Sequence, residues 1–151
     1  MSVEFASEGV PVSVRELNEL ERRLGVALPS DYRNFLLRRN GGRVRDNDLA
    51  TPEGEEIGIA VQSFLSVGSG MADSMDEFLG MYSGRYPGEL LPIAEAVGGN
   101  LILIRVKGDR KGEVFFWDHE LEGDEEPVWS NLTLLAPSFD QFMEALVPYV
   151  D

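Results

Sequence analysis

The side chains of this chain that could take part in chemistry are almost all carboxylates. The sequence contains 27 Asp and Glu residues, no cysteine and one histidine, His119. A metal site would have at most one nitrogen ligand, and thiolate zinc sites and cysteine nucleophiles are excluded. A Ser-His-Asp triad would need His119 as its base, but no G-x-S-x-G motif supplies a nucleophile. We therefore interpret His119 as a strand-end histidine, exposed or bonded to a neighbour.

Two short motifs resemble binding loops but are incomplete. Asp46-Asn47-Asp48 could begin a calcium loop, but Thr51 and Ile57 stand where that loop needs glycine and glutamate. Gly68-Ser69-Gly70 lacks the rest of a dinucleotide fingerprint. Any two carboxylates could meet in the fold and act as acid and base, but nothing in the sequence singles out a pair. We predict no cofactor, no metal and no catalytic residues, so the protein is not expected to be an enzyme.

Two acidic segments are the strongest candidates for a binding surface. The stretch from Asp118 to Glu126 contains no Lys or Arg. Like charges held together repel one another, so folding alone does not explain such a cluster. Its flanks, Phe116-Trp117 and Val128-Trp129, are apolar and could anchor both ends on a sheet. We predict a partner-binding surface that consists of Asp118, Glu120, Glu122, Asp124, Glu125 and Glu126, with Asp46, Asp48, Glu53, Glu55 and Glu56 as a second part of the same face. A loop that only improves solubility is the alternative.

The charge of the chain is large and unevenly distributed. The formal net charge is −14 over 151 residues. Residues 1–45 hold eight Arg and six acidic residues, a net +2, and residues 46–151 hold five basic and twenty-one acidic residues, a net −16. Such a field repels nucleic acid and anionic membranes and attracts a basic protein partner. An acidic surface that serves only solubility is again the alternative.

The hydrophobic pattern predicts an α+β domain. Apolar residues at helical spacing predict helices over residues 13–24, 30–39 and 74–82 and a last helix after Ser138. Runs of apolar residues predict strands over 59–67, 90–94, 101–106, 113–117 and 128–135. We expect Ser13 and Glu16 to form a capping box, Ser30 to cap the second helix, and Gly41 or Gly42 to end it with a positive φ. The fold expected is an antiparallel sheet with amphipathic helices packed on it.

The chain length fits one domain. We expect residues 1–12 to form a loosely held N-terminal arm and residues 13–151 to form the domain. No run of about 18 apolar residues predicts a membrane span, and the first ten residues lack the basic start of a signal peptide. The expected location is the cytoplasm.

Two ordered blocks of residues resemble the SUKH superfamily, which contains Smi/Knr-type cell-wall assembly regulators of fungi and many bacterial immunity proteins. The first block runs from Leu24-Gly25 through Leu28-Pro29 and Asp31-Tyr32 to Asn40-Gly41-Gly42. The second block consists of Leu91-Pro92-Ile93-Ala94, Gly99-Asn100 and the stretch from Gly112 to Glu120, which includes Trp117-Asp118-His119-Glu120. One departure is that Val97 or Gly98 stands where the family often has an acidic residue. The resemblance covers most of residues 13–146 and implies the same α+β architecture.

The resemblance implies a protein that binds another protein. An immunity protein that neutralises a basic toxin domain, for example a nuclease, fits the acidic surface, because opposite charge speeds association and competes with the substrate of such a toxin. A regulatory or scaffold protein of the cell-wall regulator type, with a cellular partner, is the alternative. A toxin gene directly upstream would favour immunity, whereas an isolated gene would favour regulation. The sequence leaves the oligomeric state open.

Overall fold

A computed structural model of the chain describes residues 3–7, 10–50, 55, 57–68, 73–121 and 127–148. The helices are α1 (Val14–Leu24), α2 (Ser30–Arg38), α3 (Met75–Tyr82) and α4 (Phe139–Ala145), with one 3-10 turn, η1 (His119–Leu121). The strands are β1 (Gly42–Arg43), β2 (Asn47–Leu49), β3 (Val61–Phe64), β4 (Leu90–Ala96), β5 (Leu101–Arg105), β6 (Val114–Trp117), β7 (Leu132–Ala136) and β8 (Leu146–Pro148).

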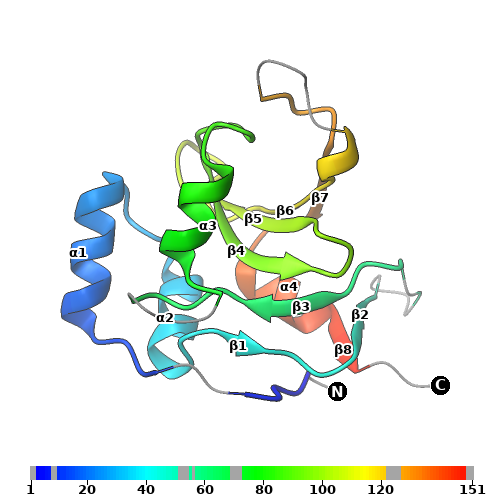
Figure 1. Ribbon diagram of the computed structural model, residues 1–151, viewed down its shortest axis with the longest axis horizontal. Coiled ribbons are helices and arrows are strands. Elements are labelled where there is room, and N and C mark those ends of the chain that lie inside the picture. Colours follow the sequence, from blue (N-terminus) through cyan, green and yellow to red (C-terminus); the bar gives the residue numbers. More distant parts are fainter. Residues whose placement is uncertain are drawn as a thin grey trace.

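A six-stranded antiparallel sheet forms the centre of the molecule (Figure 1), and its strand order is β1-β3-β4-β5-β6-β7. A second, two-stranded sheet pairs β2 with β8. The α+β class and the antiparallel sheet predicted from the sequence are confirmed. The hairpin from β5 to β6 joins two almost fully buried strands, as their continuous apolar runs predicted.

Helices cover both faces of the large sheet. Phe64 lies in one cross-strand row with Ala94, Ile102 and Phe116. Its ring lies 6.3 Å from Phe139 of α4, so α4 covers that face. The neighbouring residue Trp117 faces the other way. Tyr82 of α3 meets Trp117 edge-on at 5.9 Å, so α3 covers the opposite face.

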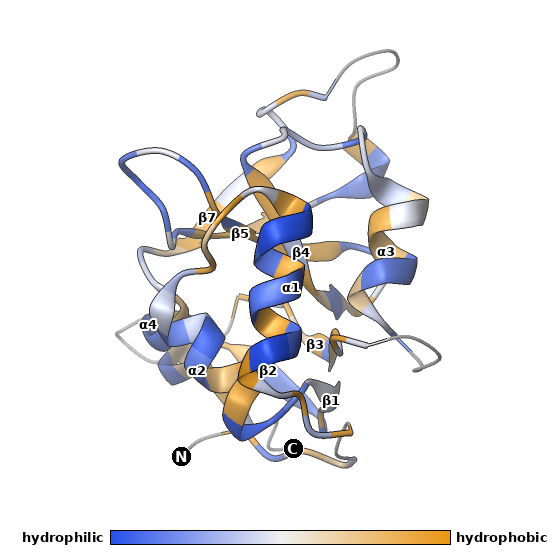
Figure 2. Cartoon of the chain, turned by 90° about the vertical axis from the view of Figure 1, so that its left-hand side faces the viewer, coloured by the Kyte–Doolittle hydropathy of each residue, from blue (hydrophilic) through white to orange (hydrophobic). Residues whose placement is uncertain are grey.

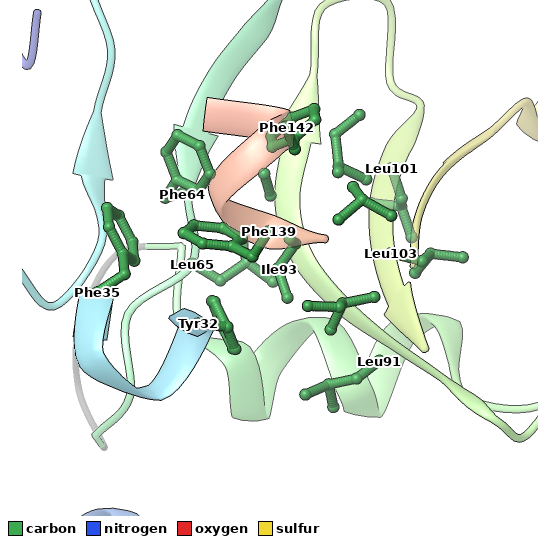
Figure 3. Close-up of a cluster of buried hydrophobic side chains, with 14 of the residues drawn as sticks. Tyr32, Phe35, Phe64, Leu65, Leu91, Ile93, Leu101, Leu103, Phe139 and Phe142 are labelled. Atoms are coloured by element: carbon green, nitrogen blue, oxygen red, sulfur yellow. The ribbon is translucent and has the colours of Figure 1, made fainter. Parts of the chain in front are cut away.

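The core on the α4 side is rich in aromatic rings (Figure 3), and Phe35 of α2 packs against both Phe64 and Phe139. The ring centroids are 5.2 Å and 5.0 Å from that of Phe35, in tilted geometries that aromatic quadrupoles favour. The apolar stripe of α2 thus faces the core. On α1 the buried residues are Leu17 and Leu20, while most of its surface is hydrophilic (Figure 2).

The ends of α1 follow the sequence signals. The Ser13 hydroxyl accepts a hydrogen bond from the Glu16 backbone N–H, and the Glu16 carboxylate accepts one from the Ser13 N–H. Gly25 ends α1 with φ of +70°, which lets its N–H reach the carbonyls of the last turn. The predicted capping box is confirmed.

The start of α2 differs from the prediction. Ser30 is already helical, Pro29 occupies the cap position, and no side chain caps the helix there. The prediction that Ser30 caps α2 is therefore wrong, because a residue inside the first turn cannot serve as its own cap. Asp31 binds the helix-start N–H groups instead, since its carboxylate accepts from the N–H of Tyr32 at 2.8 Å and from that of Asp140 in α4 at 3.1 Å.

Some predicted boundaries also shift. The strand predicted over 59–67 is shorter, since β3 spans only Val61–Phe64; beyond it, the Leu65 N–H still donates to the Ile93 carbonyl and Ser66 forms an isolated bridge with Ser74. The last helix ends at Ala145, so Leu146 begins a strand that pattern analysis did not predict, and this strand pairs with β2. The described part of the N-terminal arm is not loose, since Phe5 forms a bridge with Val44 and its ring contacts Phe35 and Phe64.

Gly41 is the glycine that the fold cannot replace. Gly41 and Gly42 have φ of +74° and +126°, so the predicted positive φ is confirmed. A Cβ on Gly41 would lie 2.6 Å from the Leu65 carbonyl oxygen and 2.7 Å from that of Phe64. Both neighbours are backbone atoms of the β3 segment, which cannot swing away as a side chain would.

We predict that Gly41→Ala destabilises the protein far more than Gly25→Ala. Both positions have positive φ, which costs a non-glycine residue about 1 to 2 kcal/mol. A Cβ on Gly25 meets nothing within 4 Å, so Gly25→Ala carries only that cost. Urea unfolding should show a loss for Gly41→Ala that exceeds the loss for Gly25→Ala by more than about 1 kcal/mol. Equal losses would contradict the close backbone contact.

Candidate functional site

The first acidic segment begins with a tightly bonded turn. Asp118 follows β6, and its carboxylate accepts a hydrogen bond from the Glu120 N–H at 3.0 Å. Its backbone is tied to Asn131, because the Asp118 N–H donates to the Asn131 carbonyl and the Asn131 amide donates to the Asp118 carbonyl. The Asp118 carboxylate therefore stabilises η1, while Glu120 is exposed to solvent.

The turn between β4 and β5 also contacts the turn that begins at Asp118. The Asn100 side-chain oxygen accepts a hydrogen bond from the His119 N–H at 3.0 Å. The His119 ring Nε2 lies 3.2 Å from the Gly98 carbonyl. Gly99 has φ of +83°, and a Cβ there would lie 3.5 Å from His119 Nε2. The interpretation of His119 as a strand-end histidine bonded to a neighbour is confirmed.

The second acidic segment lines a shallow groove of about 460 Å³. Its lining residues are Arg43, Val44, Asp46, Asn47, Asp48, Gly58, Ala60, Val61, Gln62 and Val97. The Asp48 carboxylate accepts hydrogen bonds from the N–H groups of Leu49 and Gly58, whereas Asp46 is exposed. Arg43 lies in the same groove, so this part of the surface carries both signs of charge.

The β4–β5 turn connects the two acidic segments. Val97 lines the groove of Asp46 and Asp48, and the next residues, Gly98 and Asn100, contact His119. Both segments therefore lie at the same end of the sheet, on the right-hand side of Figure 1. Of the other predicted residues, Glu55 is exposed, whereas Glu53, Glu56, Glu122, Asp124, Glu125 and Glu126 lie outside the described residues.

Exposed apolar side chains lie in the same turns as these acidic residues, and the sequence did not predict the apolar ones. Val97 is 60% exposed, Leu121 is 64% exposed and Ile57 is 45% exposed. The one trace of this in the sequence is that Val97 or Gly98 stands where the resembled family often has an acidic residue. We call the residues Asp46, Asp48, Ile57, Val97, Asp118, Glu120 and Leu121 the acidic end of the sheet.

One pair of carboxylates meets elsewhere in the fold. Ser63 and Glu95 are paired across β3 and β4, and the Ser63 hydroxyl donates to the Asp73 carboxylate at 3.1 Å. Burial and the negative charge of Asp73 raise the pKa of Glu95. Asp73 also has a φ of +53°, unusual outside glycine. These contacts fix the return of the chain into α3, because the Asp73 carbonyl accepts from the Ser66 N–H at 3.0 Å.

The described part of the chain contains no group of three or more His, Asp or Glu side chains that could hold a metal ion. Within the same residues, no helix is long and apolar enough to span a membrane.

Each of the two family-like blocks contains an asparagine whose side chain bonds distant backbone groups. The Asn40 side chain accepts from the Val67 N–H and donates to the carbonyls of Val67 and Val10. In the second block Asn100 bonds His119, as described above. Asn40 and Asn100 therefore each close a contact between segments far apart in the sequence.

A known family profile matches the part of the chain that contains both blocks. The SMI1 / KNR4 family (SUKH-1) profile covers residues 11–145. The chain belongs to this family. It is 32% identical over 148 residues to the SPbeta prophage-derived uncharacterized protein YokK of Bacillus subtilis (strain 168), an alignment that covers 87% of this chain and 73% of YokK. It is also 44% identical over 36 residues to the uncharacterized protein YnaB of the same strain, covering 24% of this chain and 25% of YnaB.

We predict that Asn100→Ala loosens the acidic turn. The substitution removes the acceptor of the part-buried His119 N–H, and losing such a hydrogen bond costs about 1 kcal/mol. Hydrogen exchange at the His119 amide should accelerate. Asn100→Asp, which keeps an acceptor oxygen, is the control and should keep exchange slow. Unchanged exchange in Asn100→Ala would show that Asn100 does not hold the turn.

We predict that Glu95→Gln stabilises the protein at pH 7. Because the pKa of Glu95 is raised in the folded state, its ionisation reduces stability as the pH rises above the pKa of the unfolded chain. Urea unfolding should show Glu95→Gln as more stable than wild type at pH 7, with the difference vanishing below about pH 4. A difference that is independent of pH would contradict the assignment.

Proposed function

We propose that this protein is a non-catalytic immunity protein that neutralises a basic toxin domain by binding it with the acidic end of the sheet. The observation that carries the proposal is the combination of exposed apolar and acidic side chains at one end of the sheet. Protein-binding surfaces typically have an apolar centre and a polar rim, and here Val97 and Leu121 supply the centre. Asp46 and Glu120 supply charge beside it.

The charge of the chain supports a basic partner. Residues 46–151 carry a net −16, and the four carboxylates at 122, 124, 125 and 126 directly follow Leu121 in sequence. A field of this sign steers a cationic protein toward the surface and raises the association rate. A toxin that acts on nucleic acid needs a cationic cleft, and an acidic protein in that cleft would exclude its substrate.

The rigid base of the surface supports recognition without a large ordering cost. Asp118 and His119 are bonded to Asn131 and Asn100, which belong to neighbouring turns. A preorganised turn loses little conformational entropy on binding. The exposed residues Val97 and Leu121 are therefore presented by a backbone that is already in place.

Family membership supports the class of function, since the family includes immunity proteins. The alternative is a regulatory protein with a cellular partner, as in the cell-wall assembly regulators. The similarity to a prophage-derived protein favours immunity, because a toxin and its immunity protein form a self-contained pair that can move together. Co-expression with a toxin encoded beside the gene tests this choice, since only an immunity protein should restore growth.

We predict that removing charge from the acidic segment weakens binding without weakening the fold. Glu122, Asp124, Glu125 and Glu126 are changed together to Gln or Asn. Association with a catalytically inactive form of the neighbouring toxin should slow, and its salt dependence should flatten, because steering acts through the net field. The melting temperature should stay nearly unchanged. An unchanged association rate and salt slope would place the contact elsewhere.

A matched pair of apolar variants tests the centre of the surface. Val97→Ser combined with Leu121→Ser should raise the dissociation rate of the same complex, because apolar anchors act mainly after docking. Val14→Ser, at a position on α1 that is 52% exposed, is the control and should leave binding unchanged. Equal effects of the two variants would contradict the assignment.

A further inference from the structure

The two edges of the large sheet differ in how they are covered. At the β1 edge, residues 3–7 run alongside, with the Ala6 N–H donating to the Arg43 carbonyl at 2.8 Å and the Arg45 N–H donating to the Glu4 carbonyl at 2.9 Å. At the other edge lies β7, which pairs with β6 on one side and, among the described residues, with no strand on the other (Figure 1). The β7 edge is therefore open to a further strand.

The sequence of β7 lacks the side chains that usually protect an edge. Natural edge strands commonly carry charged residues or proline, which prevent pairing with another chain. β7 reads Leu-Thr-Leu-Leu-Ala, without either, in a protein of which 26% of residues are charged. Thr133 and Leu134 are both exposed, and Leu134 is 51% exposed. One irregularity lies near its end, where the register with β6 shifts next to Leu135.

The backbone of Leu134 faces away from the sheet. The Asn131 carbonyl accepts from the Asp118 N–H, so residue 131 points its backbone groups toward the β6 side. In an antiparallel strand these directions alternate, so those of Thr133 point to β6 and those of Leu134 point outward. The Leu132 N–H does not bond β6, in agreement with this alternation, because it donates to the Trp129 carbonyl at 3.1 Å.

Opposite charges lie at the two ends of β7. The first residue of β7, Leu132, follows Asn131, whose side-chain amide donates to the Asp118 carbonyl. The Asp118 carboxylate in turn accepts from the Glu120 N–H, so this end of β7 lies next to acidic residues. Its last residue lies beside the β5–β6 loop, which carries Lys107, Arg110 and Lys111, and a Cβ on Gly112 of that loop would lie 3.9 Å from the Pro137 carbonyl. When two such strands pair antiparallel, the acidic end of each meets the basic loop of the other.

We propose that two copies of this chain associate through antiparallel pairing of β7 with β7, about a twofold axis near Leu134. The outward N–H and C=O of Leu134 in each copy bond those of the other, and the two six-stranded sheets become continuous. Leu134 pairs with Phe115, and Trp129, which is 43% exposed, packs on the same Phe115 ring at 5.9 Å. These apolar side chains lose solvent contact in the dimer.

The net charge of each copy opposes the dimer only weakly. Long-range repulsion between two chains of −14 is screened beyond about 8 Å at physiological salt. In the paired arrangement the end of β7 next to Glu120 faces the Arg110–Lys111 loop of the other copy, and these opposite charges attract. A contact of five residues per strand gives a reversible dimer, which forms without any toxin, although Glu120 belongs both to this contact and to the acidic end of the sheet.

The test is the mass of the protein in solution as a function of concentration. Sedimentation from about 10 µM to about 1 mM should show the 16.8 kDa chain shifting toward twice that mass. Leu134→Asp places two like charges at the axis and should weaken dimerisation at least tenfold. Val14→Asp is the matched control, since Val14 is 52% exposed, and should dimerise as wild type does. Circular dichroism verifies that both variants are folded.

A charge exchange tests the arrangement within the dimer. Arg110→Glu combined with Lys111→Glu should weaken the dimer, because two acidic segments then meet. Mixing this variant with Glu120→Lys should recover a heterodimer, because one copy then supplies the cation and the other the anion. A wild-type protein that stays monomeric over the whole range would overturn the proposal, as would a Leu134→Asp variant that dimerises like wild type or a mixture that recovers nothing.

Discussion

The short strand β3 depends on two buried asparagine side chains, and much of the fold depends on β3. At its start, the Asn47 side chain accepts from the Val61 N–H at 2.9 Å and donates to the Val61 carbonyl at 2.8 Å. Beyond its end, the Asn40 side chain makes the same pair of bonds with Val67, each at 2.8 Å. A carboxamide offers one donor and one acceptor side by side, as a neighbouring backbone would, so each asparagine replaces a missing strand residue.

These two contacts explain why the segments around β3 lie where they do. Asn40 and Gly41 join the end of α2 to the residues after β3, and Gly41 lets the two backbones touch. Asn47 places β2 beside β3, and β2 in turn pairs with β8 at the end of the chain. Both asparagines are almost fully buried, so losing Asn47 or Asn40 would leave the backbone groups of Val61 or Val67 without these partners, at a cost of about 1 to 3 kcal/mol per group.

The sequence predicted the parts of the fold that depend on local patterns. The capping box at Ser13, the positive φ at Gly41 and Gly42 and the buried β5–β6 hairpin follow from spacing and residue type, and they are confirmed. The role of Ser30 and the strand at Leu146 were missed, because a distant partner decides them. The Asp140 N–H of α4 donates to the Asp31 carboxylate, and pairing with β2 makes Leu146–Pro148 a strand. Neither partner is visible from nearby sequence.

The candidate site, like the fold, was predicted from the sequence only in part. Charge alone pointed to Asp118, Glu120, Asp46 and Asp48, but it could not show that Val97 would sit between them, since this depends on how the β4–β5 turn contacts His119 and the groove. Charge also could not show that the Asp118 and Asp48 carboxylates are partly used by backbone N–H groups. Among the described residues of the two segments, Glu120, Asp46 and Glu55 are exposed, whereas Asp118 and Asp48 are half-buried.

The family-like residues and the proposed binding residues have different physical roles. Asn40, Gly41, Asn100 and His119 close backbone contacts, so changing them costs stability before it changes recognition. The side chains of Val97, Leu121 and Glu120 are exposed, so changing them costs little stability. In the proposed complex such changes act directly on the affinity for the partner. A fold arranged in this way keeps the turn between β4 and β5 fixed while its surface can vary.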